Sequence, residues 1–108
     1  MLRESAKAEG RAVNVQAVSN AVLDPLIPGG RELIAFVDAV TLVDFEELAI
    51  ARGDLIAELG LPGASRAASV CAAFEGTNRI LDAFGVKVNK RYLDIGDALG
   101  VRVPDHLL

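Results

Sequence analysis

The chain has 108 residues and a mass of 11.4 kDa, a size that fits one domain with one core. Its net charge of −4 argues against a nucleic-acid partner, because phosphates require a clustered basic surface that its 11 scattered Lys and Arg residues do not form. Hydrophobic residues make up 52% of the chain, which is high for a small protein. We therefore expect apolar surface to remain exposed and to be covered by homo-oligomer formation.

The sequence predicts no membrane partner and no metal or cofactor. No stretch approaches 18 uninterrupted apolar residues, and the first ten residues lack the apolar segment of a signal peptide. The expected location is the cytoplasm. Cys71 is the only cysteine, so an internal disulfide, a Cys-x-x-Cys pair or a four-thiolate zinc site would need a second chain.

Over the first 23 residues the sequence predicts a weakly defined helical segment. Residues 2–9 fit one or two helical turns that end at Gly10. Asn14 is placed to cap a helix over 15–23, because its side chain can accept hydrogen bonds from first-turn amides. The alternation of residue types around Asn14 also fits a strand, but we favour the helix.

Two amphipathic helices are predicted next. Helix 31–42 carries apolar residues at helical spacing. Helix 45–59 follows Asp44, which can accept from the unpaired first-turn amides while Glu47 reaches back to the amide of the cap. We predict that the turn at 60–63, which contains two glycines and a proline, ends this helix.

The strongest periodicity lies in residues 64–84. Its apolar stripe recurs at alternating steps of three and four: Ala67, Val70, Phe74, Thr77, Leu81 and Phe84. A second face of mostly smaller residues lies beside the stripe: Ala73, Gly76, Ile80 and Ala83. We predict that this helix is buried on two sides at the centre of the fold, with Phe74 in the core and a left-handed cap at Gly85.

Asn89 is placed to cap a last helix over 90–99, which Gly100 closes, and residues 101–108 form a tail. No internal repeat or strand pattern is evident. The predicted fold is an all-α single domain over residues 1–108, a compact bundle of about five helices.

Four residues on the central helix form the only candidate polar site. Cys71, Glu75 and Asn78 follow one another along the polar border of the helix, and Arg79 lies four residues after Glu75 in the order that favours an ion pair. The favoured interpretation is structural: Cys71 fills a tight helix contact, and the other three tie the helix to its neighbours. The alternative is that Arg79 binds an anionic substrate. We assign no catalytic residue.

Several segments of the sequence resemble the alkylhydroperoxidase D-like branch of the carboxymuconolactone decarboxylase family. These segments are RELIAFVDAVTL after Asp24-Pro25, DFEEL, and SVCAAFEGTNRILDAFGV. The most specific parts of the last segment are AAF, NR, and DA before GV. The resemblance covers residues 24–89, the carboxy-terminal half of that family's pattern.

The resemblance implies an all-helical fold, assembly into oligomers and, often, thiol-dependent peroxide reduction. That activity depends on a Cys-x-x-Cys motif with a nearby His on a helix upstream of the matched region, and this sequence has no such motif. One thiol attacks peroxide and the second resolves the sulfenic acid, so a single Cys71 does not complete this cycle. None of the family's catalytic residues is carried over.

Three hypotheses follow. The favoured one is a non-catalytic or truncated relative that acts as a self-associating helical domain. The second is a fragment of a thiol-dependent peroxidase whose Cys-x-x-Cys helix precedes residue 1. The third is a small helical ligand-binding module with an enclosed, mostly apolar cavity near Cys71, Asn78 and Arg79.

Overall fold

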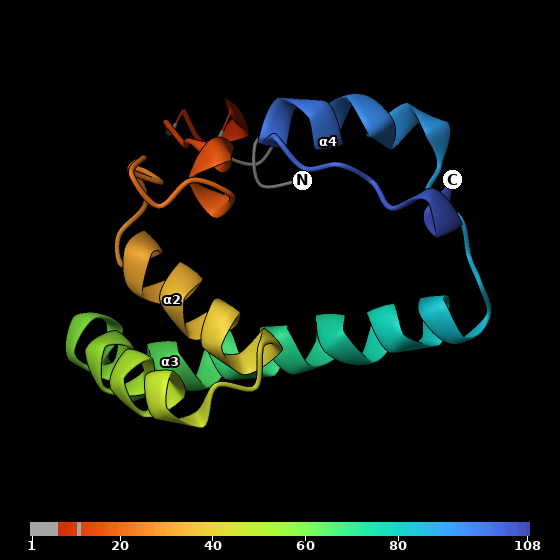
Figure 1. Ribbon diagram of the computed structural model, residues 1–108. Helices are drawn as coiled ribbons and strands as arrows, with labels where there is room; N and C mark the ends of the chain where they lie inside the picture. The colour runs from red at the N-terminus through yellow and green to blue at the C-terminus, as the bar shows by residue number, and fades with distance from the viewer. Residues whose placement is uncertain (1–6, 11) are drawn as a thin grey trace. The chain divides into compact units, whose positions relative to one another are not determined.

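The computed structural model describes residues 7–10 and 12–108, and every regular element among them is a helix (Figure 1). The α-helices are α2 (Gly30–Thr41), α3 (Phe45–Ala83) and α4 (Leu93–Leu99), and three short 3₁₀ helices are η1 (Val15–Val18), η2 (Lys90–Tyr92) and η3 (Asp105–Leu107). The predicted all-α class is therefore confirmed. The predicted five-helix bundle is wrong, because the helices expected at 45–59 and 64–84 are two segments of α3, and most of 15–23 is not helical.

The chain divides into two compact units, each described below by itself. One unit is Leu26–Glu75, and the other combines Met1–Pro25 with Gly76–Leu108. The helix predicted over residues 2–9 falls largely on residues 1–6, outside the described residues. The prediction of a single domain over 1–108 stays a prediction.

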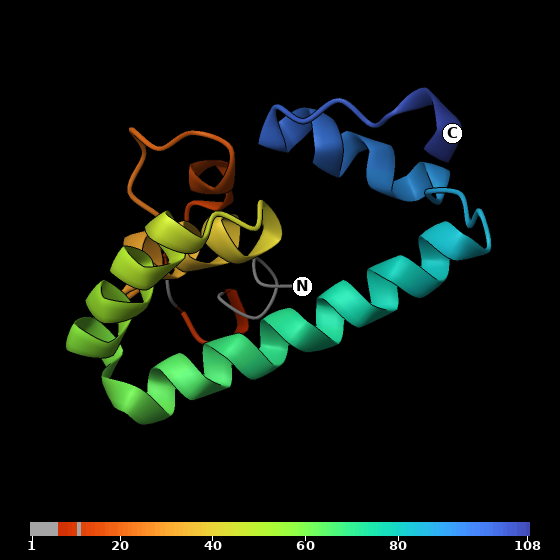
Figure 2. The same ribbon diagram turned by 60° about the horizontal axis from the view of Figure 1, so that its bottom comes forward.

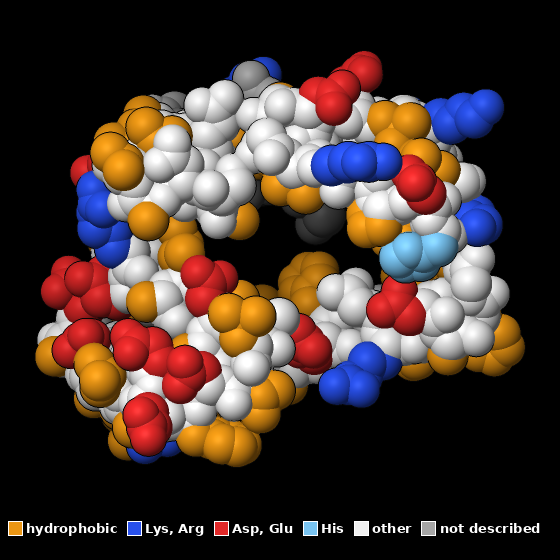
Figure 3. All heavy atoms as spheres, in the orientation of Figure 1, with side chains coloured by type: hydrophobic (Ala, Val, Ile, Leu, Met, Phe, Trp, Pro, Cys, Tyr) orange, Lys and Arg blue, Asp and Glu red, His pale blue; other side chains and the backbone are white. Residues whose placement is uncertain are grey.

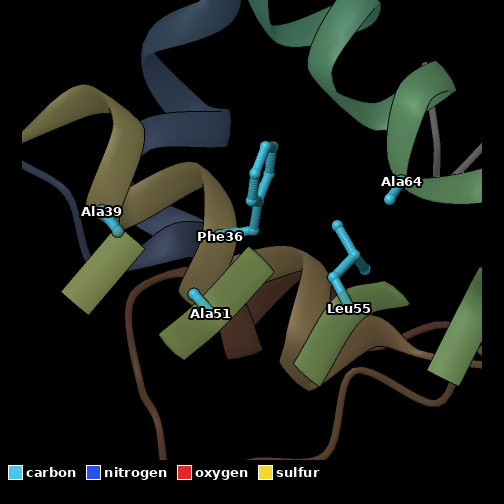
Figure 4. Close-up of a cluster of buried hydrophobic side chains, with 5 residues drawn as sticks. All are labelled: Phe36, Ala39, Ala51, Leu55 and Ala64. Atoms are coloured by element: carbon cyan, nitrogen blue, oxygen red, sulfur yellow. The ribbon is translucent and has the colours of Figure 1, made fainter. Parts of the chain in front are cut away.

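The core of the unit Leu26–Glu75 lies between α2 and α3 (Figure 4). Its buried side chains are Phe36, Ala39, Ala51, Leu55 and Ala64, and Leu55 is fully buried. Further apolar side chains pack against this cluster: Leu33, Val40, Leu48, Ile56, Leu59 and Ala67. The helices predicted at 31–42 and 45–59 are thus present, and their facing apolar sides form the core.

The start of α3 follows its predicted cap. Asp44 Oδ1 accepts a hydrogen bond from the Glu47 amide at 3.1 Å, and the Asp44 carbonyl accepts from the Leu48 amide at 2.8 Å. The first bond satisfies an amide that the first turn of a helix leaves without a partner, and the second is the first backbone bond of the helix itself. The Asp44 amide donates to the Ala39 carbonyl at 3.1 Å, so it bonds the last turns of α2 and not the Glu47 side chain as predicted.

A sharp bend at Gly60 divides α3 into two segments (Figure 2). Gly60 has φ 73° and ψ 169°, a conformation that essentially only glycine adopts. Pro62 follows in the first turn after the bend, where a helix needs no amide from it, so helical structure resumes at once. The prediction that the turn at 60–63 ends the helix over 45–59 is confirmed at Gly60, where the backbone leaves the helical conformation, but residues 61–63 already belong to the second segment.

Leu59 packs closely at this bend. A Cβ atom on Gly29 would lie 2.8 Å from Leu59 Cδ2, and one on Gly63 would lie 2.8 Å from Leu59 Cβ. Any larger residue at these two positions would collide with Leu59. The close approach joins the start of α2 to both sides of the bend in α3.

The second segment of α3 is not buried on two sides, which corrects the central prediction for 64–84. Val70 is 50% exposed, Phe74 61% and Phe84 83%. The smaller face is exposed as well, with Ile80 at 63%. The residues covered instead are Ala64, which is buried, and Cys71 and Glu75, which are partly buried. At 3.6 residues per turn these three lie within about 40° of one another, on a different side from the apolar stripe.

In the unit formed by Met1–Pro25 and Gly76–Leu108, side chains of the N-terminal stretch donate hydrogen bonds to the end of α4. Gln16 Nε2 donates to the Ala98 carbonyl at 3.0 Å, and the Ser19 hydroxyl donates to the Leu99 carbonyl. These bonds satisfy carbonyls at the end of α4, which have no partner within the helix. Gly100, with φ 70°, closes α4 as predicted.

Both asparagine caps in this unit are present. Asn14 Oδ1 accepts from the Gln16 amide at 3.2 Å, but the helix that follows is only the 3₁₀ turn η1. Asn89 Oδ1 accepts from the Arg91 amide at 3.1 Å and begins η2, which leads into α4. The predicted left-handed cap at Gly85 is confirmed, with φ 64°.

Removal of the buried Leu55 side chain tests the core. Leu55→Ala should lower the free energy of unfolding by about 2 to 5 kcal/mol, because it removes buried methyl groups and leaves a cavity. Ile50, which is 59% exposed on the same helix, provides the control. Ile50→Ala should change the free energy of unfolding by no more than about 0.5 kcal/mol. Urea denaturation of both variants measures these changes. Equal losses in the two variants would contradict the assigned core.

The bend is tested by a pair of glycine substitutions with opposite expected signs. Gly60→Ala should destabilise the fold by about 1 to 3 kcal/mol, because alanine is strained at this backbone geometry. Gly53 lies inside the first α3 segment, and nothing lies within 4 Å of an added Cβ. Gly53→Ala should therefore stabilise by about 0.5 to 1 kcal/mol. Chemical denaturation of both variants measures this, and a neutral Gly60→Ala would argue against the bend.

Candidate functional site

The four candidate residues lie on successive turns of the second α3 segment, but they do not share one environment. Cys71 and Glu75 are partly buried and belong to the unit Leu26–Glu75. Asn78 and Arg79 are exposed and belong to the other unit. Whether the four residues form one site stays a prediction.

Glu75 contacts the end of α2. Thr41 Oγ1 donates a hydrogen bond to Glu75 Oε1 at 3.4 Å. Within the part of the chain that the structure describes, no ion pair joins Glu75 to Arg79. Glu75 bonds to Thr41 instead of forming the predicted ion pair. The contact agrees with the structural interpretation of Glu75, which ties α3 to a neighbouring helix.

Cys71 lies on the same covered side of α3 as Ala64 and Glu75, and its thiol is free. The predicted packing role of Cys71 stays a prediction.

A groove of about 560 Å³ begins at the last turns of α3. The residues that line it are Asn78, Leu81, Asp82, Val86, Lys87, Val88, Asn89, Tyr92 and Leu107. Of the four candidate residues only Asn78 belongs to it. The groove is open to solvent, so it is not the enclosed cavity that the ligand-binding hypothesis requires.

Two interactions beside this groove were not predicted from the sequence. The guanidinium carbon of Arg91 lies 4.7 Å from the centre of the Tyr92 ring, and Arg91 Nη2 donates to Tyr92 Oη at 2.6 Å. Lys87 Nζ donates to the His106 carbonyl at 2.6 Å. The Asn89 cap predicts the start of the last helix, but it does not indicate which side chains of that helix line a groove.

The C-terminal residues form one wall of the groove. The Val88 amide donates to the Leu107 carbonyl at 2.7 Å, and the Leu107 side chain lines the groove. The predicted tail at 101–108 therefore contains an ordered 3₁₀ turn, η3, that contacts the segment after α3.

Among residues 7–10 and 12–108, no group of three or more His, Cys, Asp or Glu side chains is arranged to hold a metal ion. None of the helices formed by these residues is both long and apolar enough to cross a membrane.

Comparison with known proteins finds no matching family, no matching curated protein and no matching solved structure. The resemblance to the alkylhydroperoxidase D-like proteins thus rests on the sequence motifs alone.

The lone thiol leads to a prediction about peroxide chemistry. The purified chain with a dithiol donor should reduce hydrogen peroxide no faster than buffer, because Cys71 has no second thiol in the chain to resolve a sulfenic acid. Donor oxidation measured with wild type and Cys71→Ser checks this. A wild-type rate that Cys71→Ser abolishes would contradict it.

Proposed function

We propose that this chain functions as a self-associating helical domain whose copies join through the apolar stripe of α3. We define the α3 stripe as Val70, Phe74, Thr77, Leu81 and Phe84. The observation that carries the proposal is the exposure of the large side chains in this stripe, which lies between 41% and 83%. Exposed apolar patches of this kind mark interaction surfaces in soluble proteins.

Each unit by itself leaves its share of the stripe exposed. Val70 and Phe74 belong to the unit Leu26–Glu75, and Leu81 and Phe84 belong to the other unit. The buried apolar residues among those described are few and mostly alanines: Ala17, Phe36, Ala39, Ala51, Leu55 and Ala64. Burial of apolar area contributes roughly 25 cal/mol per Å², so burying the stripe between copies would add stability that so small a core does not provide.

The spacing of the α3 stripe suits two identical helices in antiparallel contact. Its members follow at steps of four, three, four and three, which places them on one side of the helix. The pattern is also nearly symmetric about Thr77. An apolar pattern of this kind can pair with its own copy about a two-fold axis.

We also propose that the chain is a non-catalytic relative of the alkylhydroperoxidase D-like proteins. Oligomeric assembly is what the resemblance implies for this helix, and the absence of a thiol pair in the sequence supports a role without peroxide turnover. The partly buried position of Cys71 on the covered side of α3 also supports a packing role for this residue.

A charge placed in the α3 stripe tests self-association. Wild type should sediment as an oligomer at tens of micromolar, and Phe74→Asp should sediment as a monomer, because association would bury an unpaired carboxylate. Ile50→Asp is the control, since Ile50 lies on the same helix outside the stripe and has a similar exposure, 59% against 61% for Phe74. A monomeric wild type, or equal loss in both variants, would refute the proposal.

A further inference from the structure

The bend in α3 depends on the backbone of a single residue. Within α3, whose 39 residues are all described, only Gly60 has φ and ψ outside the helical region. Helical φ and ψ at Gly60 would therefore turn Phe45–Ala83 into one straight helix. The bent and the straight form of α3 thus differ in the conformation of one residue.

The bend brings two parts of α3 into one core. Leu55 lies before the bend and Ala64 after it, and both belong to the buried cluster (Figure 4). Thr41 Oγ1 donates to Glu75 Oε1 at 3.4 Å, which ties the end of the returning segment, residues 61–75, to the end of α2. A straight α3 would take the returning segment away from this core, so the same contacts would form only with a second copy. Such an exchange of identical elements is domain swapping.

The first segment of α3 offers the returning segment one side only. The other side carries exposed acidic residues: Glu46, Glu47, Asp54 and Glu58. Figure 3 shows acidic side chains gathered over this part of the molecule. A returning segment, whether from the same chain or from a second copy, would therefore pack on the side that carries Leu55.

Pro62 makes the straight form unfavourable. In an uninterrupted helix the amide of residue 62 would donate to the carbonyl of residue 58, but proline has no amide hydrogen, and its ring would collide with that carbonyl. In the bent form Pro62 lies in the first turn after Gly60, where a helix needs no such bond. Pro62 therefore disfavours the straight form and not the bent one.

Gly63 leaves room for the bent form. A Cβ atom on Gly63 would lie 2.8 Å from Leu59 Cβ, which is too close for two carbon atoms of side chains. In a straight helix, residues four apart have Cβ atoms about 5 to 6 Å apart. A side chain at position 63 would thus disfavour the bent form and fit the straight one.

We propose that Gly60, Pro62 and Gly63 form a conformational device that keeps α3 bent and thereby prevents domain swapping between copies of this chain. Gly60 permits the bend, Gly63 leaves room for Leu59 within it, and Pro62 opposes the straight helix. The returning segment then packs on the core of its own chain. This inference goes beyond the proposed self-association, because it concerns how each copy folds and not which surfaces pair.

A distance within one chain distinguishes the two forms. Spin labels at Glu46→Cys and Ala72→Cys, both exposed positions, would lie about 39 Å apart along a straight helix at 1.5 Å per residue. The bent form keeps them much closer, because Glu75 bonds to Thr41. Cys71→Ser removes the native thiol from the labelled chain, and an excess of unlabelled chain leaves only distances within one chain.

Removal of the device should produce the swapped form. Gly60→Ala/Pro62→Ala should lengthen the main distance to about 39 Å and convert a monomer into a dimer, because it disfavours the bend and permits the straight helix. Every variant also carries Phe74→Asp, so that pairing of α3 stripes adds nothing to the mass. Gly60→Ala alone and Pro62→Ala alone should keep the short distance. Pulsed electron spin resonance measures the distance, and sedimentation equilibrium measures the mass.

A matched control makes the same two changes away from the bend. Gly53→Ala/Pro104→Ala should keep the short distance and the monomer, since both positions are exposed. If Gly60→Ala/Pro62→Ala does not fold, Pro62→Ala/Gly63→Ala decides in the same way, because its added methyl group collides with Leu59 only in the bent form.

The outcomes separate this inference from the proposed function. A folded double variant at the bend that keeps the short distance would overturn the inference, and so would a long distance in a monomer. Unfolding of both double variants would also overturn it, because no swapped form then exists for the device to prevent. A monomeric chain without Phe74→Asp would overturn the self-association alone.

Discussion

The bend at Gly60 determines which side of α3 is covered. Its backbone geometry is open essentially only to glycine, and it lets the helix resume in a new direction without an intervening loop. Leu59 packs against positions 29 and 63, where only glycine leaves room for it. The returning segment therefore lies against its unit through Ala64, Cys71 and Glu75, and the larger apolar side chains of the α3 stripe point elsewhere.

This arrangement explains how a chain with 52% hydrophobic residues can have so few buried ones. Among the described residues, large apolar side chains of the α3 stripe are exposed, including Val70, Phe74 and Leu81. The proposed self-association would cover this stripe and add to a small core.

The position of Cys71 has a related consequence. It shares the covered side of α3 with Glu75, whose carboxylate contacts Thr41 at the end of α2. On the second segment of α3, the covered side thus carries small and polar residues, whereas Phe74 is exposed.

The sequence by itself determined the helical class, the caps at Asp44 and Asn89, the glycine ends at Gly85 and Gly100, and the facing sides of helices 31–42 and 45–59. These features depend on contacts within a few residues, which local spacing encodes. Only the tertiary structure decided the direction in which the helix continues after Gly60, that the apolar stripe of 64–84 is exposed, and that Lys87, Tyr92 and Leu107 line one groove. Periodicity identifies an apolar side, but whether a core or solvent meets that side depends on the direction in which the chain returns, and a single backbone conformation at Gly60 sets this direction.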